Sequence, residues 1–434
     1  MSDYFPDEII VEIFSRLPVK SLIRFRCVTK TWCSLISSHD FIKMHLNRSL
    51  SSTKNPPFLI FRHYDDKMEK EWFTLLSSND PFPQNHFSKH LDCKWVFREQ
   101  NRLVLEKQMK KKGFFAYPSD FKELHFPYRS FMKQNLDVVG SSNGLVCLLN
   151  DTPGDETDLV ALLWNPSIRK SIFLPCPGVK FYPSLHPMHY LGFGYDPIND
   201  DYKLVRLVYL YDLFDQYSDG KKYFPVSDFQ IYTLRTGAWR TITGHSCQII
   251  ADQSFSVFLN GSIHWFGHTR EHNGDFHNAN SASRNVILSF DIGDEDFHEM
   301  AVPKSLEEVH RFNMKVAVLD GLLALVPYRD QAFGGFCSVW VMKEYGVAET
   351  WTKLFNINFG NVLGFTMNGE VLVTKSGKLR IYDPNSQRTL NPHIHAQPES
   401  FYFDTYMESL VLLNVEDGVE ESLIPQFESL FYGH

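Results

Sequence analysis

The fold of this chain is decided near its beginning, where residues 3–48 read DYFPDEIIVEIFSRLPVKSLIRFRCVTKTWCSLISSHDFIKMHLNR. Ile9, Ile13 and Leu17 recur at the spacing that puts side chains on one face of a helix. Pro6 stands in the first turn, where its missing N–H costs nothing, and acidic residues follow it near the positive end of the helix. The stretch therefore opens with an amphipathic helix.

Further helices are expected in the same stretch. Pro18 ends the first helix, and Ser21, Thr29 and Asp40 are candidate N-caps for three more. A module below about 40 residues rarely buries enough surface to be stable alone. Three or four short helices with this many large apolar residues are therefore expected to present some of them to the rest of the chain or to another protein.

The stretch resembles the F-box along its whole length. The resemblance implies docking onto the Skp-family adaptor of an SCF ubiquitin ligase, with exposed apolar side chains as anchors. Phe5 is a departure, since the family usually has leucine before the first proline. An ordinary helical cap on a larger domain is the alternative. The positions that the resemblance assigns to adaptor binding are Phe5, Pro6, Ile9, Ile10, Ile13, Leu17, Pro18, Leu22, Val28, Trp32, Leu35 and Ile36.

The composition is that of a soluble globular protein, with 43% hydrophobic and 22% charged residues. A formal net charge of −8 argues against a nucleic-acid or membrane-surface binder, because phosphate binding needs clustered positive charge. Acidic residues interrupt any N-terminal apolar run that could serve as a secretory signal, and no stretch of about 18 apolar residues could span a bilayer. The seven scattered cysteines are typical of reduced thiols. We expect a cytoplasmic or nuclear protein.

From Phe58 onward, short apolar runs alternate with Gly, Pro, Asn and Asp, which is typical of strands and turns. Further along, four strands recur in units of about 40 to 55 residues, the pattern of a β-propeller. Asn260-Gly261 between two such runs predicts a hairpin. With residues 58–135 as a weakly patterned first unit, about six blades are expected. An all-β sandwich is the alternative.

The predicted fold class is therefore α+β by segregation, with a three- to four-helix F-box followed by an all-β, propeller-like domain. An aromatic residue followed by Asn or Asp recurs at strand ends and supports a repeat. The predicted parts are 1–48 as the F-box helical domain, 49–57 as a linker, 58–412 as the propeller-like domain and 413–434 as a C-terminal tail.

The β region resembles the plant F-box-associated interaction domain, from roughly Leu136 to Val411. Together with the F-box, this resemblance implies membership of the plant F-box group that includes the S-locus F-box and F-box/kelch-like proteins. The Trp-Asp dipeptide of WD repeats is absent, and one double glycine, Gly334-Gly335, is too little to indicate kelch repeats. The matching segments are GSSNGLVC (140–147), LWNPS (163–167), GFGYD (192–196), DDYK (200–203), FLNG (258–261), HW (264–265), VWVMKEYG (339–346), WTKL (351–354) and ESLV (408–411).

One string matches a catalytic motif. Residues 140–144 fit the Gly-x-Ser-x-Gly pattern of a hydrolase nucleophile elbow, with Ser142 as the nucleophile. That elbow requires a helix after the serine, whereas residues 145–149 have the pattern of a strand. We therefore expect a turn here and no catalytic residue.

Histidines gather in one polar insertion. His268, His272 and His277 lie there with Asp275, and such clusters can bind zinc. Because no helix aligns these residues, a solvated loop is the better interpretation. We expect no metal site and no cofactor.

Long polar insertions interrupt the strand pattern in several places. A rigid β scaffold presents such loops, and recognition surfaces often use them. The alternative is that they are variable, solvated connections without a partner. The insertions cover 151–158, 211–222, 267–284 and 328–335. The residues predicted to contact a protein substrate are Asp212, Phe214, Asp215, Tyr217, His268, Arg270, His272, Arg329 and Phe333.

These features predict an adaptor and not an enzyme. The F-box would bind the Skp-family subunit, and through it the cullin and RING subunits, while the β domain would hold a protein substrate of unknown identity. Proximity alone would then promote ubiquitin transfer. The alternatives are an F-box scaffold that acts outside ubiquitination and a propeller enzyme with a fortuitous helical cap. A sugar-binding role lacks support in the sequence.

Overall fold

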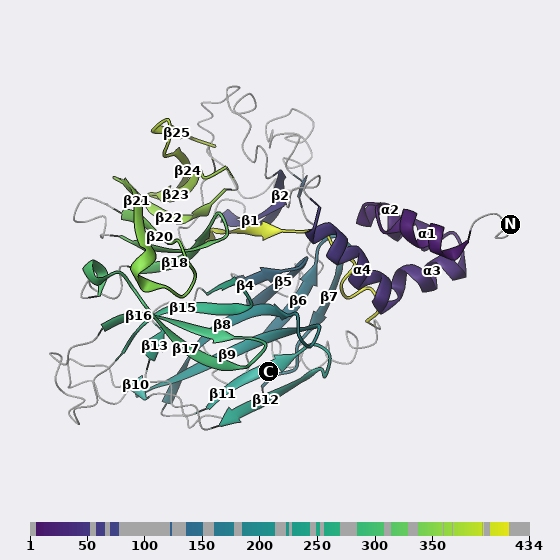
Figure 1. Cartoon of the computed structure of the whole chain (residues 1–434), viewed down its shortest axis with the longest axis horizontal. Helices are drawn as coiled ribbons and strands as arrows, with labels where there is room; N and C mark the ends of the chain where they lie inside the picture. The colour runs from purple at the N-terminus through teal and green to yellow at the C-terminus, as the bar shows by residue number, and fades with distance from the viewer. Residues whose placement is uncertain are drawn as a thin grey trace, which may run out of the picture.

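A computed structural model gives the fold of the chain. Figure 1 shows the N-terminal helices projecting from one side of a body made of strands, with α4 as the helix next to that body. The structure describes residues 6–52, 58–65, 70–77, 122–123, 136–150, 160–177, 185–212, 223–224, 228–243, 249–251, 256–269, 284–307, 314–328, 337–358, 360–366, 368–392, 394 and 400–415.

Four helices form the N-terminal module, as the apolar periodicity predicts. They are α1 (Asp7–Phe14), α2 (Val19–Phe25), α3 (Lys30–Ser37) and α4 (His39–Leu50). The last helix thus extends to Leu50, within the predicted linker 49–57.

Side-chain caps begin the last two helices. The Trp32 N–H donates to Thr29 Oγ1 at 3.1 Å, so the predicted cap of α3 is confirmed. The predicted cap of α4 is wrong, because the Phe41 N–H donates to Ser38 Oγ at 3.3 Å and Asp40 lies within the first turn. Ser38 takes this position because α4 starts directly after α3, with no room for a longer connection.

Prolines begin the first two helices. Pro6 precedes α1 with a φ of −56°, and Pro18 precedes α2 with a φ of −60°, and neither helix has a side-chain cap. Because the proline ring fixes φ while ψ stays extended, the helix starts at the next residue. The prediction of Ser21 as the cap of α2 is therefore wrong, since Ser21 lies inside the helix.

The described strands form six antiparallel sheets, which confirms the predicted propeller-like fold. The first three, in order across each sheet, are β26 (Tyr402–Tyr406), β1 (Phe58–Asp65), β2 (Lys70–Ser77) and β3 (Lys122–Glu123); β4 (Leu136–Ser142), β5 (Leu145–Asn150), β6 (Val160–Asn165) and β7 (Lys170–Phe173); and β8 (Leu185–Asp196), β9 (Asp201–Asp212), β11 (Asp228–Thr233) and β12 (Ala238–Thr243), with β10 (Tyr223–Phe224) also on β9.

The other three sheets complete the ring. They are β13 (Ile249–Ala251) and β14 (Val257–Leu259), both paired with β15 (Ser262–Thr269), then β16 (Arg284–Asp291) and β17 (Asp296–Ala301); β18 (Met314–Leu319), β19 (Leu322–Pro327), β20 (Cys337–Met342) and β21 (Trp351–Ile357); and β22 (Asn361–Phe365), β23 (Val371–Lys375), β24 (Lys378–Asp383) and β25 (Arg388–Leu390).

The two ends of the β region meet in the first sheet. β26 pairs with β1, with Tyr406 opposite Phe58 and Tyr402 opposite Arg62. Around the ring, β26 contacts β4, β4 contacts β8, and β8 contacts β14. On the other side, β14 contacts β18, β18 contacts β22, and β22 contacts β26. The fourth strand of the first sheet therefore comes from near the other end of the chain and not from residues 58–135.

Tight hairpins join the strands of several blades. Asn143-Gly144 and Asn260-Gly261 both have two successive residues with positive φ, at 48° and 85° and at 52° and 80°. This is the type I′ turn, whose twist suits antiparallel strands, and the hairpin predicted at Asn260-Gly261 is confirmed. Asp320-Gly321 and Ser376-Gly377 have the same pair of positive φ values.

A second turn explains the recurring aromatic-Asn or aromatic-Asp pattern. Asn165 Oδ1 accepts a hydrogen bond from the Ser167 N–H at 3.0 Å, and Asp196 Oδ1 accepts one from the Ile198 N–H at 2.9 Å. The same bond forms at Asp291 and Asp383. The Asn or Asp side chain thus closes the turn, while the preceding aromatic residue lies in the strand.

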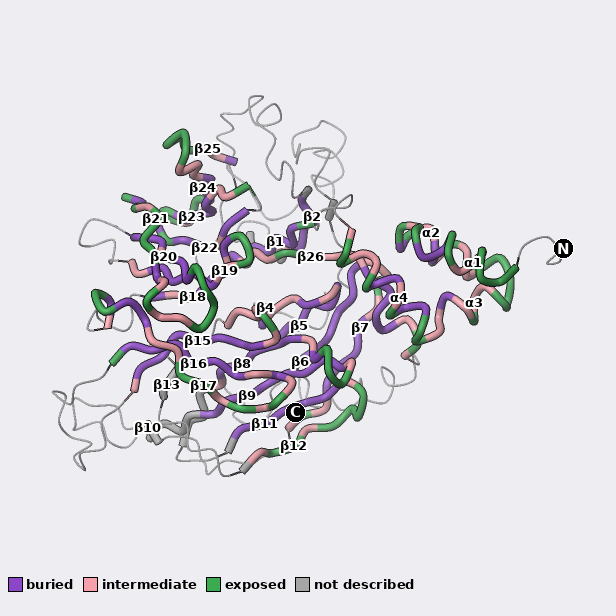
Figure 2. Tube along the Cα trace, in the orientation of Figure 1, coloured by how far each residue is buried: buried purple, intermediate pink, exposed green. Residues whose placement is uncertain are grey.

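The helices and the propeller share one hydrophobic core cluster. It includes Phe41 and Leu46 of α4, Leu163 of β6, and Leu410 and Leu412 beyond β26. In Figure 2, buried segments of α4 adjoin buried segments of the strands. The helical module is therefore packed against the propeller and is not a separate unit on a tether.

Polar contacts reinforce this junction. Asp200, in the turn between β8 and β9, accepts a hydrogen bond from Lys43 at 2.6 Å and lies 3.1 Å from His39, both on α4. Burial favours a higher pKa for Asp200, but the hydrogen bonds from Lys43 and Tyr195 outweigh it and hold that pKa below its usual value. The ionised carboxylate of Asp200 therefore bonds to two side chains in the first turns of α4, the Lys43 ammonium and the His39 ring.

Gly144 lies where residues 407–415, which we call the C-terminal segment, cross the β4–β5 hairpin. A Cβ at Gly144 would contact Ser409 Oγ and lie 2.6 Å from the Met407 carbonyl oxygen, whereas a Cβ at Gly261 would meet nothing within 4 Å. Both glycines have positive φ, at 85° and 80°. The two positions share the backbone constraint and differ only in the space around them.

We therefore expect Gly144→Ala to destabilise the protein more than Gly261→Ala. The left-handed conformation costs an alanine about 1–2 kcal/mol at either site, and overpacking adds about 1–3 kcal/mol at Gly144 alone. Denaturant unfolding of both variants measures the difference. Equal losses of stability would mean that the C-terminal segment does not pack tightly on this hairpin.

Candidate functional site

The helical module exposes several large apolar side chains, among them three outside α4 and Leu50 of α4, which is 50% exposed. Ile9 and Ile13 of α1 are 44% and 50% exposed, and Val28, between α2 and α3, is 58% exposed. Ile9 and Ile13 are four residues apart and therefore lie on the same face of the helix. Pro6, at the start of α1, is exposed as well. Branched side chains this exposed are suited to contact another protein.

An aromatic cluster supports this surface from within the module. Phe14 packs against Phe25 and Trp32, with ring centroids 5.5 and 5.0 Å apart. Leu22 of α2 and Ile36 of α3 have no exposed surface. These side chains therefore hold the helices together.

Burial divides the residues that the F-box resemblance assigns to adaptor binding. A partner could reach Leu22 and Ile36 only if the helices separated, so the structure supports a packing role for these two. Phe5 lies outside the described residues. Pro6, Ile9, Ile13, Pro18 and Val28 are exposed, whereas Ile10, Leu17, Trp32 and Leu35 are partly buried.

Charged contacts fix α1 on α4. Arg48 of α4 donates to Glu12 Oε2 at 3.0 Å and to Ser15 Oγ at 2.9 Å, and Arg16 also bonds to Glu12. The hydrogen bonds from Arg48 and Arg16 lower the pKa of Glu12 to about 2.

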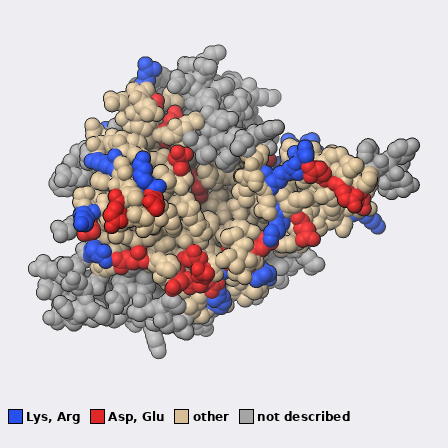
Figure 3. Space-filling model, viewed as in Figure 1, with Lys and Arg blue, Asp and Glu red and all other residues tan. Residues whose placement is uncertain are grey.

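On the face shown in Figure 3, basic and acidic side chains are interspersed over helices and strands. The described residues on that face form no large positive area of the kind that phosphate backbones require.

The residues predicted to contact a substrate are only partly described. His268 lies in β15, opposite Ile250 of β13, and is 2% exposed. It is thus buried in the fourth sheet and cannot contact a substrate as part of a loop, because β15 is longer than its apolar run suggests. Asp212 is the last residue of β9. Phe214, Asp215, Tyr217, Arg270, His272, Arg329 and Phe333, as well as Asp275 and His277, lie outside the described residues.

Two titratable groups, each on a strand at the edge of its sheet, join neighbouring blades. Burial raises the pKa of Asp404 on β26 to about 6, and this carboxyl accepts hydrogen bonds from the Tyr402 hydroxyl, at 2.7 Å, and from the backbone of Ser141 on β4. Burial lowers the pKa of Lys315 on β18 to about 8, and Lys315 donates to the Leu363 carbonyl of β22 at 3.1 Å. These contacts link adjacent blades and give both groups a structural role.

The Gly-x-Ser-x-Gly string does not form a nucleophile elbow. Ser142 ends β4 and is 8% exposed, and strand β5 follows after the turn at residues 143–144. The helix that would stabilise an attacking serine is therefore replaced by a strand.

Within the described part of the chain, no three His, Cys, Asp or Glu side chains lie close enough together to hold a metal ion. None of the helices described here is long and apolar enough to cross a membrane.

Comparison with known families matches both parts of the chain. The F-box domain family matches residues 3–44, and the F-box associated beta propeller domain family matches residues 96–408. F-box protein CPR1 of Arabidopsis thaliana is 27% identical over 435 residues, which cover 94% of this chain and 88% of that protein. An F-box/kelch-repeat protein of the same plant is 28% identical over 359 residues, which cover 81% of this chain and 79% of that protein.

Solved structures give weaker similarity. A polysaccharide lyase of the ulvan lyase family has a TM-score of 0.34 or 0.35 in two structures, at 10% identity and with 68% of each chain covered. A puromycin hydrolase has a TM-score of 0.34 at 12% identity, with 59% of this chain and 39% of its own chain covered. Similarity at this level carries no argument about activity.

The division between exposed and buried isoleucines predicts different stability effects. Ile36→Ala removes a fully buried side chain and is expected to cost about 2–5 kcal/mol, whereas Ile13→Ala, at a half-exposed position, is expected to cost less than about 1 kcal/mol. Hydrogen exchange of the helical amides measures both effects locally. Equal loss of protection in the two variants would contradict the described packing of the helices.

Proposed function

The chain belongs to the family of F-box proteins that carry an F-box associated β-propeller domain, and we propose that it is the substrate-recognition subunit of an SCF-type E3 ubiquitin ligase. Proteins of this family are typically adaptors without catalytic activity of their own. In this role the F-box binds a Skp-family adaptor, and through it the cullin and RING subunits. The propeller binds a protein substrate, which is then marked for ubiquitin-dependent degradation.

Exposed apolar side chains of the helical module, at Pro6, Ile9, Ile13 and Val28, support the proposal. These side chains lie on a four-helix module that α4 joins to the propeller, and α1 to α3 extend away from the strands in Figure 1. A partner can therefore approach the helices without displacing the propeller. Burial of these side chains in a groove of the partner would remove apolar surface from water.

The packed junction suits a subunit that works by proximity. The shared core and the contacts of Asp200 with α4 restrict the orientation of the F-box relative to the propeller. A substrate on the propeller would then stay at a defined distance from the ubiquitin-transfer subunits. A restricted geometry of this kind raises effective concentration without a catalytic residue or cofactor.

The substrate-binding part of the proposal rests on the propeller loops. Asp212, at the end of β9, and charged and aromatic residues of the insertions, such as Phe214, Tyr217 and Arg329, are the predicted contacts. We propose a cytoplasmic or nuclear location, which the buried thiols of Cys147 and Cys337 support, because reduced cysteines are typical of those compartments.

Adaptor binding tests the proposal through the exposed isoleucines. We expect the double variant Ile9→Asp/Ile13→Asp to bind a purified plant Skp-family adaptor at least about 30-fold more weakly than the unmodified chain, since it places two charges in an apolar contact. Leu354→Asp, at an exposed leucine of β21 in the propeller, is the matched control and should bind normally. Equal binding by both variants would contradict the proposed surface.

Ubiquitin transfer separates the proposed role from that of a scaffold outside ubiquitination. In a ligase assembled from the full chain, the adaptor, a cullin and a RING subunit, we expect proteins captured by the propeller to be ubiquitinated, and we expect the Ile9→Asp/Ile13→Asp variant to abolish this transfer. Tight adaptor binding without transfer to any captured protein would favour the scaffold.

A further inference from the structure

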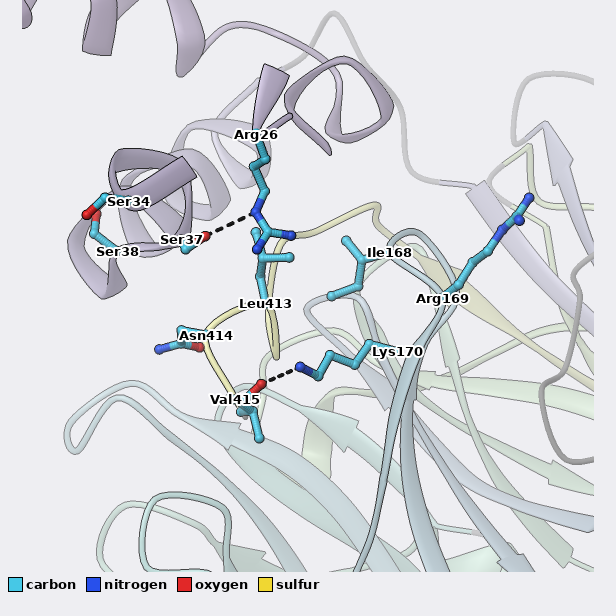
Figure 4. A pocket seen from close by; sticks show the side chains of 10 residues that line it. All are labelled: Arg26, Ser34, Ser37, Ser38, Ile168, Arg169, Lys170, Leu413, Asn414 and Val415. Carbon is cyan, nitrogen blue, oxygen red and sulfur yellow. Dashed lines mark hydrogen bonds between the residues drawn. The ribbon is translucent and has the colours of Figure 1, made fainter. Parts of the chain in front are cut away.

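An open pocket of about 850 Å³ lies where the helical module, the propeller and the C-terminal segment meet. Its walls come from α2 to the start of α4, from the β6–β7 turn with the first residue of β7, and from residues 413–415. Figure 4 shows these three parts around one space. The volume is in the range of small-molecule sites in proteins, about 300–1,000 Å³.

The pocket is basic in an acidic protein. Among its ten lining residues, Arg26, Arg169 and Lys170 are basic and none is acidic, while the whole chain has a formal net charge of −8. Three serines and an asparagine complete its polar lining. Hydroxyl and amide groups can donate further hydrogen bonds to an anion that enters the pocket.

Two of the cations face the space from different walls. Arg26 Nε donates to Ser37 Oγ at 3.1 Å, which orients the guanidinium and leaves its terminal N–H groups toward the C-terminal segment. Lys170, across the pocket, donates to the Val415 carbonyl oxygen. In Figure 4, Arg169 extends from the same turn away from Lys170, so it contributes mainly a longer-range positive potential.

Three other cations of the helical module have carboxylate partners. Lys43 pairs with Asp200, and Arg16 and Arg48 pair with Glu12. No carboxylate in the described part of the chain pairs with Arg26 or Arg169. Both Arg26 and Lys170 line the pocket, so their positive charges would attract an anion that enters it.

We propose that this pocket binds a small ligand that carries at least two phosphate groups. An arginine guanidinium can hold one phosphate through two parallel hydrogen bonds, and a lysine on the opposite wall can hold a second as a point charge. Because the walls belong to the F-box, the propeller and the C-terminal segment, the ligand ties all three together. The inference does not depend on the proposed ligase function.

Calorimetric titration of the full chain with sodium tripolyphosphate, at constant ionic strength, tests the site. We expect one tripolyphosphate per chain, bound at least about tenfold more tightly than orthophosphate, and a melting temperature raised by about 2 °C or more at saturating probe. Arg26→Gln should weaken binding at least about tenfold, because a charge-assisted hydrogen bond is lost. Arg24→Gln removes an exposed arginine in the last turn of α2, two residues before Arg26, that does not line the pocket and should leave binding unchanged.

Three results would overturn the proposal. The first is equal weakening by Arg24→Gln and Arg26→Gln, which would indicate non-specific attraction. The second is unchanged binding by Arg26→Gln or, if that variant does not fold, by Arg26→Lys, which keeps the charge but loses the paired hydrogen bonds. The third is no binding by the full chain and none by a chain that ends at Val415, which lacks the following acidic run EDGVEE of residues 416–421 as a competitor.

Discussion

The pairing of β26 with β1 is the contact on which the rest of the structure depends. It joins strands from opposite ends of the β region and closes the ring of six sheets. Because β1 follows α4 closely in the sequence, the same pairing also brings the helices against the ring. Leu410 and Leu412, beyond β26, then enter the core cluster that the helices and the propeller share. One strand pairing therefore determines both the closure of the propeller and the position of the F-box.

A packed junction gives the protein a defined geometry for function. The carboxylate of Asp200 holds α4 from the β8–β9 turn, and Asn165 Nδ2 donates to the carbonyl oxygens of Ser409 and Val411 at 3.1 and 2.8 Å. The C-terminal segment thus lies between the second sheet and the helices. A restricted orientation suits a protein that works by proximity, because a larger fraction of its bound substrate is then held where transfer can occur.

Local patterns predict a large part of this fold. Helical spacing predicts the first helix, the cap at Thr29 and the hairpin at Asn260-Gly261 follow from residue type, and each depends only on residues near one another in the sequence. The cap of α4 at Ser38 is not predictable in this way, since the boundary with α3 depends on how closely the two helices follow each other. The role of β26 in the first sheet depends on a pairing between distant segments, which local periodicity does not reveal. Likewise, helical spacing puts Ile13 and Ile36 on apolar helix faces but does not tell which face is buried inside the module.

Hydrogen exchange of the full chain with and without a plant Skp-family adaptor shows which part of the protein the adaptor contacts. We expect added protection at the amides of α1 and of the segment between α2 and α3, where Ile9, Ile13 and Val28 are exposed, and unchanged protection in the propeller strands. Protection confined to the propeller, or none in the helices at saturating adaptor, would mean that the helices are not the docking surface.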